Sequence, residues 1–156
     1  MRLKTEDAME KYRDNVFAAA FSILKNPDDA DDIVQETFLA YHRETKDFES
    51  EEHIRAWLLR VAINKAKNES RKLFRRAGVP LEEYMETLIF ETPAAENLFE
   101  EVMKLPSKYR IVLHLFYYED YPVKDISAML GVSESNVKVR LNRGRKLLKG
   151  LLEEEE

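Results

Sequence analysis

The scarcity of helix breakers most constrains what this chain can fold into. Only four glycines and five prolines interrupt 156 residues, too few for the many turns of a sheet protein. Between these breakers, apolar residues recur at the three- and four-residue spacing of a helix face. The pattern predicts an all-α chain, with helices over residues 5–24, 27–41, 53–74, 107–117, 123–130 and 134–152.

The breakers also divide the chain into two small helical domains. Gly78 and Pro80 end the first domain, and a segment rich in glutamate follows them. We place the domains at residues 1–76 and 98–156, joined by an acidic linker at 77–97. The linker is either a solvated spacer or a short amphipathic helix, because it carries apolar residues at helical spacing. These residues are Leu81, Tyr84, Met85, Leu88 and Ile89.

Composition removes several classes of protein. The chain has no cysteine, which excludes disulfides, thiolate metal sites and thiol nucleophiles. No apolar run approaches the roughly 18 residues of a membrane span, and residues 1–8 lack the apolar stretch of a signal peptide. His42, His53 and His114 show no metal-ligand spacing. We therefore expect a soluble cytoplasmic protein without a cofactor, metal or catalytic residue, and not an enzyme by itself.

The charges are segregated along the chain. Residues 55–76 hold eight Lys and Arg against one Glu, and residues 134–149 hold six against one. The net charge is nevertheless −5, so the remainder of the chain is strongly acidic. A surface that only has to be solvated mixes the two signs. The segregation predicts two basic helices for polyanions and acidic surfaces for other partners.

Residues 123–148 follow the logic of a helix-turn-helix. Gly131 permits the positive φ of a tight turn, and Ser133 can cap the helix that follows. The alternative is a capped hairpin in a helical bundle, which would not need six basic residues. We predict that the second helix enters a major groove. The residues assigned to DNA contact are Ser135, Lys138, Val139, Arg140, Asn142, Arg143 and Lys146.

The other basic helix carries a different mixture of side chains. Asn64 and Asn68 stand among basic residues, and two aromatic residues, Phe48 and Trp57, lie nearby in the sequence. Such rings can stack on unpaired bases. For Trp57, burial in the core is the favoured interpretation. The basic run alone indicates only a polyanion, bound with salt-dependent affinity.

Three segments in order resemble the extracytoplasmic-function subfamily of the sigma-70 sigma factors. Residues 30–38 are similar to its core-binding segment, and residues 54–64 to the segment that melts the minus-ten element. Residues 105–145 resemble the domain that reads the minus-thirty-five element. The resemblance implies two helical domains, of sigma region 2 and region 4 type.

The resemblance also implies roles for single residues. Asp31, Asp32, Gln35 and Glu36 would dock on core RNA polymerase, at the clamp helices of its largest subunit, with the flap as a further contact. Stabilisation of the helix dipole is the alternative for the acids, and it explains Asp28 and Asp29 better than it explains Gln35. The residues implied at the minus-ten element are Phe48, Arg60, Asn64, Lys67 and Asn68; those at the minus-thirty-five element are the seven on the second basic helix.

The chain departs from the family at informative positions. The base-capture loop, which in the family is often basic, is acidic here over residues 48–52. Phe116 stands where the family often has Arg, and Gly144, where Ala is common, costs its helix about 1 kcal/mol. In the family the linker runs toward the RNA exit path of the polymerase. The acids of the linker either mimic RNA in that path or only keep the linker solvated. These acids are Glu82, Glu83, Glu86 and Glu91.

The leading hypothesis is a sigma factor, monomeric when free, that recruits core RNA polymerase to promoters and helps melt them. An anti-sigma factor is an expected further partner. One alternative is a sigma-like mimic that titrates an anti-sigma factor, although a mimic has no need of Lys138, Arg140 and Arg143. The other is a stand-alone helix-turn-helix regulator, which leaves the match of residues 29–64 unexplained.

Overall fold

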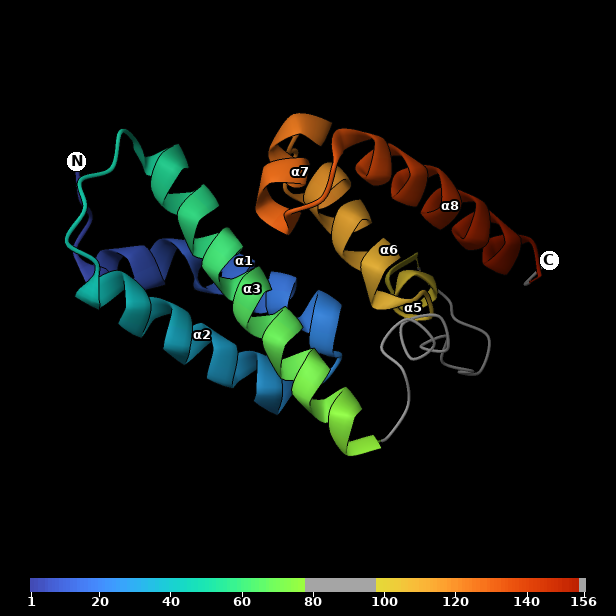
Figure 1. Ribbon diagram of the computed structural model, residues 1–156, viewed down its shortest axis with the longest axis horizontal. Helices are drawn as coiled ribbons and strands as arrows, with labels where there is room; N and C mark the ends of the chain where they lie inside the picture. Colours follow the sequence, from blue (N-terminus) through green and yellow to red (C-terminus); the bar gives the residue numbers. More distant parts are fainter. Residues whose placement is uncertain (78–97, 155–156) are drawn as a thin grey trace. The chain divides into compact units, whose positions relative to one another are not determined.

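The computed structural model describes residues 1–77 and 98–154. Apart from Ala77, the proposed linker, with its amphipathic stretch and its glutamates, therefore lies outside the described residues. The chain divides into two compact units, of which the first spans Met1–Ser70 (Figure 1). Every regular element within the described ranges is a helix, as the breaker pattern predicts.

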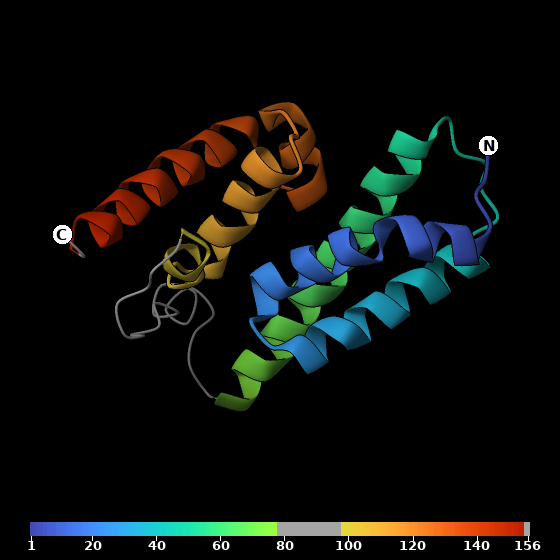
Figure 2. The same ribbon diagram turned by 180° about the vertical axis from the view of Figure 1, so that it is seen from behind.

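Three helices build the first unit. α1 (Thr5–Leu24) and α2 (Pro27–Arg43) lie side by side, and α3 (Glu51–Ala77) crosses them (Figures 1 and 2). The α1–α2 corner follows the predicted chemistry, since Asn26 Oδ1 accepts a hydrogen bond from Asp29 N at 3.0 Å. Apolar side chains of all three helices are buried together. They include Val16, Ala19, Ile33, Val34, Phe38, Ile54, Leu58, Ala62 and Ala66.

α3 is longer than the apolar pattern predicts. It begins at Glu51 rather than His53 and ends at Ala77 rather than Phe74. Ser50 explains the earlier start, because its hydroxyl accepts a hydrogen bond from His53 N at 3.1 Å and so caps the helix. The acidic first turn further favours that start through the helix dipole.

The second unit contains α5 (Leu98–Met103), α6 (Ser107–Leu113), the π-helix η1 (His114–Tyr118), α7 (Val123–Leu130) and α8 (Glu134–Glu153). The helix-turn-helix is formed by α7 and α8. Gly131 has a φ of 68°, and Ser133 Oγ accepts a hydrogen bond from Asn136 N at 3.0 Å. The π-helix differs from the expected regular helix over residues 107–117, and periodicity alone does not show a register change of one residue.

Gly144 has a packing role in α8. It is buried where α8 meets α6. A Cβ atom there would lie 3.3 Å from Leu113 Cδ1 and 3.4 Å from Tyr109 Cβ. The glycine therefore permits a close approach of two helices, in return for its lower helix propensity.

Candidate nucleic-acid and polymerase interfaces

One face of α8 is exposed and carries most of the predicted DNA contacts. Val137 and Leu141 turn into the core, with at most 2% of their surface exposed. The opposite face is open, and Val139 remains 45% exposed there. Arg140 differs, because it is half-buried at the side of the helix. The exposed residues of the predicted set are Ser135, Lys138, Val139, Asn142, Arg143 and Lys146.

A basic pocket of about 210 Å³ lies along one edge of this face. Burial lowers the pKa of the Arg140 guanidinium from its usual value, because its charge is held in a partly desolvated place. A phosphate bound there would meet less competition from water. The pocket is lined by Lys108, Tyr109, Asn136, Val139, Arg140 and Arg143.

Lys108 and Asn136 were not predicted as site residues. Asn136 lies in the first turn of α8, where its backbone N–H donates to Ser133 Oγ. Lys108 belongs to α6, and only the packing of α6 on α8 brings it to the pocket. No sequence signal links Lys108 to Arg140, since η1, α7 and two turns separate them along the chain.

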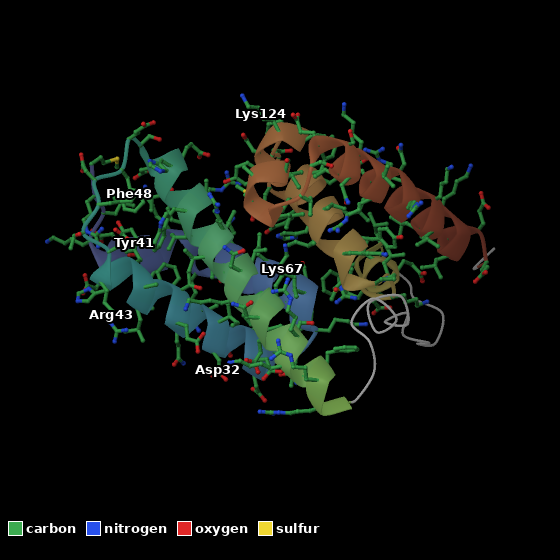
Figure 3. The ribbon with its side chains drawn as sticks, viewed as in Figure 1. Asp32, Tyr41, Arg43, Phe48, Lys67 and Lys124 are labelled. Carbon is green, nitrogen blue, oxygen red and sulfur yellow. The ribbon has the colours of Figure 1, made fainter. Side chains whose placement is uncertain are left out.

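α3 presents the polar face expected of the first domain. Arg60, Asn64 and Asn68 are exposed and stand four residues apart, so they lie in one row along the helix. Lys67 is half-buried beside this row (Figure 3). The structure thus brings together the two amides and two basic side chains of the predicted minus-ten set.

Phe48, by contrast, is not on the surface. Its side chain is 1% exposed, and its ring centroid lies 5.1 Å from that of His53 and 5.8 Å from those of Tyr41 and Trp57. Figure 3 shows Phe48 and Tyr41 at the same end of the first unit. A ring enclosed in this way has no free face for a base, so the expectation of direct stacking on DNA is corrected. The interpretation of Trp57 as a packing residue agrees with its half-buried position and its contact with Tyr41.

The acidic loop before α3 is held by backbone hydrogen bonds. Phe48 N donates to Met1 O at 3.0 Å, and Glu49 N donates to Nδ1 of His53 at 3.1 Å. The N-terminal segment that the loop contacts is itself held by α2, because Tyr41 OH donates to Leu3 O at 2.7 Å. The loop is therefore anchored from inside, with Glu49 and Ser50 exposed at its tip.

The predicted polymerase-binding residues share the outer face of α2. Asp32, Gln35 and Glu36 are exposed, and Asp31 is half-buried with Oδ1 3.9 Å from Arg13 Nη2. Leu39 was missed, although it continues the same row and is 51% exposed. An exposed leucine in an acidic row is a signal that the sequence pattern contained, at positions i, i+3, i+4 and i+7 from Asp32.

Within residues 1–77 and 98–154, no helix is both long and apolar enough to cross a membrane. The same part of the chain holds no group of three or more His, Asp or Glu side chains suited to a metal ion.

Comparison with known families identifies both units. Residues 8–76 match the family described as sigma-70 region 2, and residues 95–148 match sigma-70, region 4. The factor EcfG of Rhodopseudomonas palustris, an extracytoplasmic-function RNA polymerase sigma factor, is 31% identical over 92% of this chain and 86% of its own. The chain belongs to the extracytoplasmic-function sigma factors of the sigma-70 family. Its function is that of a sigma factor in transcription initiation.

Further comparisons place this sigma factor among its relatives. SigW of Bacillus subtilis is 26% identical over 92% of this chain and 86% of its own. The fold is that of the sigma factor RpoE from Bartonella quintana, solved in complex with the anti-sigma factor NepR. That likeness has a TM-score of 0.73 and 22% identity and covers 97% of this chain and 98% of the other. CnrH, solved with the cytosolic domain of CnrY, gives a TM-score of 0.65 at 24% identity, covering 97% and 89%.

Proposed function

We propose that this sigma factor divides promoter recognition between two domains, residues 1–76 and 98–156, with the linker 77–97 between them. The first domain binds core RNA polymerase and opens the minus-ten element. The second binds the minus-thirty-five duplex. The observation that carries the proposal is the pair of exposed basic helix faces, on α3 and on α8, in units that match regions 2 and 4.

At the minus-thirty-five element, α8 lies in the major groove. Its first turns carry short polar side chains, suited to base edges, and the basic residues further along suit phosphates. The pocket next to Arg140 gives one of those phosphates a defined place, with Lys108 and Arg143 as further cations. Fixed charges of this kind set the register of the helix on the duplex.

At the minus-ten element, the row of amides on α3 contacts the displaced strand. Amide groups can pair with the Watson–Crick edge of a base that has left the stack, while Arg60 and Lys67 attract the backbone. Phe48 supports the capture loop from beneath. Flipping a base costs a few kcal/mol, which contacts of the capture loop and α3 with that base then offset without ATP.

Core polymerase binds the outer face of α2. Asp32, Gln35 and Glu36 supply acceptors for basic groups of the clamp helices, and Leu39 supplies an apolar centre of the kind found in protein interfaces. The sigma factor RpoE of Bartonella quintana was solved in complex with the anti-sigma factor NepR, and we propose that a factor of this kind also restrains this chain. Catalysis belongs to the polymerase.

Transcription with purified core polymerase on a promoter library tests the proposal. A sigma factor yields transcripts that depend on both proteins. A mimic that only titrates an anti-sigma factor yields none, and a stand-alone regulator binds duplex DNA without core; either result would refute the proposal.

The polymerase surface has a matched pair of variants. Asp32→Asn should weaken the affinity for core polymerase, because it removes an exposed charge from the row. Asp28→Asn removes the same charge from the first turn of α2, where the helix dipole accounts for it. Equal affinities of the two variants for core polymerase would reject α2 as the docking face.

A further inference from the structure

Arg145 has more fixed partners than the other basic residues on the open face of α8. Its Nε donates to Tyr117 OH at 2.6 Å, and its Nη1 donates to Asn142 Oδ1 at 3.0 Å. Its guanidinium carbon lies 5.7 Å from the ring centroids of both Phe116 and Tyr117. The two rings pack edge to face at 5.0 Å, so they form a rigid support.

The π-helix η1 supplies this support. Phe116 and Tyr117 both belong to it, and they meet Arg145 across the unit. Tyr117 is 58% exposed, so the cluster is open to a ligand. A π-helical turn places side chains where a regular helix would not, and such turns are frequent at functional sites. Periodicity did not single out either aromatic residue for this position.

Arg145 keeps donors for a further partner. A guanidinium has five N–H groups, and the two contacts above use only part of them. No carboxylate of residues 1–77 or 98–154 forms an ion pair with Arg145. The Tyr117 oxygen accepts from Nε, which leaves its own hydroxyl hydrogen free to turn toward an acceptor. The guanidinium and the hydroxyl together suit an anion with several oxygens.

We propose that Arg145 and the Tyr117 hydroxyl form a phosphate clamp for the minus-thirty-five duplex, which rests on the proposed function of α8. Arg140 and Arg145 are five residues apart, so they diverge by about 140° around the helix. The clamp therefore lies on the opposite edge of α8 from the Lys108 pocket. A helix in the major groove has one DNA strand along each edge, and each edge here carries a prepared phosphate contact. Phe116 and Asn142 are positioning residues.

The clamp favours phosphate binding because the Arg145 side chain is already restricted before DNA binds. An arginine free in solution loses side-chain entropy when it binds, whereas stacking and two hydrogen bonds have already restricted Arg145. Contacts to the backbone are also insensitive to sequence. Loss of the clamp should weaken binding to all promoters by the same factor.

The test uses the full chain in holoenzyme and a promoter fragment selected by the wild type from a random library. Arg145→Gln should weaken binding roughly ten- to a hundredfold and lower the slope of log affinity against log salt by about 1. Tyr117→Phe keeps the ring and should weaken binding less, with little change in slope. Tyr118→Phe is the matched control, because Tyr118 is 66% exposed but stacks on His114.

Methylphosphonates placed singly in the duplex identify the phosphate. One position should weaken wild-type binding and have no further effect in Arg145→Gln or Tyr117→Phe. An unchanged salt slope in Arg145→Gln, or the absence of any coupled position, would overturn the clamp. Thermal unfolding checks each variant; if Arg145→Gln does not fold, Arg145→Lys replaces it and must lose the same coupling. Failure of the wild-type holoenzyme to bind any promoter instead overturns the proposed function together with the clamp.

Discussion

The two basic helices met the predictions made for them in different ways. On α8, six of the seven predicted contacts are exposed on one face. Around α3, the amide row is exposed, but Phe48 in the preceding loop is buried. Helical periodicity determines which way a side chain turns, because the core fixes the opposite face. A loop has no such period, so the direction of Phe48 depends on the tertiary contacts of that loop.

The largest effect should come from Phe48→Ala. This variant tests whether Phe48 packs the first unit or stacks on a base. Removing a fully buried phenyl ring should destabilise the first unit by about 3–5 kcal/mol. Chemical denaturation of the full chain, followed by tryptophan fluorescence of Trp57, measures the loss. Phe48→Leu is the control, since it retains an apolar side chain and should preserve most of the stability. Unchanged stability of Phe48→Ala together with loss of promoter melting would restore the base-stacking role.

The next prediction distinguishes the exposed faces of α3 and α8 by the stage of initiation at which each contacts DNA. Arg143→Ala should weaken binding of the minus-thirty-five duplex by roughly 1–3 kcal/mol if Arg143 reads a base. Asn64→Ala should leave closed-complex affinity unchanged and slow melting, because its amide meets DNA only after the strands part. Permanganate footprinting and filter binding of the same holoenzymes distinguish the stages. Equal losses of closed-complex affinity in both variants would contradict the division.

A smaller effect is expected at the helix caps, where one cap in each unit can be compared. Asn26 caps α2 and Ser133 caps α8, and each side chain accepts one backbone hydrogen bond at 3.0 Å. Asn26→Ala and Ser133→Ala should each cost about 1 kcal/mol of unfolding free energy. Asn26→Ser and Ser133→Asn should recover most of it, since both residues are good caps. If Ser133→Ala also weakened DNA binding beyond its stability cost, Ser133 would be a contact as well as a cap.

The smallest effect concerns acid sensitivity of the second unit. Burial lowers the pKa of His114 from 6.5, although Glu119 at 3.8 Å acts in the opposite direction. The unfolded chain therefore takes up this proton before the folded chain does. The contribution of the neutral His114 to the free energy of unfolding is fully present above about pH 6.5, and it decreases as the pH falls below that value. The melting temperature of His114→Gln should depend less on pH in that window than the wild type; an identical dependence would show that other groups control it.

Much of the site was present in the sequence because it lies on helices. The spacing of apolar residues fixed the exposed rows of α2, α3 and α8, and Gly131 and Ser133 fixed the turn before α8. Leu39 was also readable, as an apolar residue in an otherwise polar row. Local chemistry and period sufficed for these features, since neighbours within a few residues determine them.

The sequence by itself determined the helical class, the caps and the segregation of charge onto two helix faces. Only the tertiary structure decided the burial of Phe48, the pocket that Lys108 shares with Arg140, and the contact of Arg145 with Tyr117. Each of these depends on residues from separate elements. Their meeting requires a particular helix packing, which in the second unit includes the close approach at Gly144 and the register change in η1. Periodicity describes one helix at a time, whereas packing is a property of pairs.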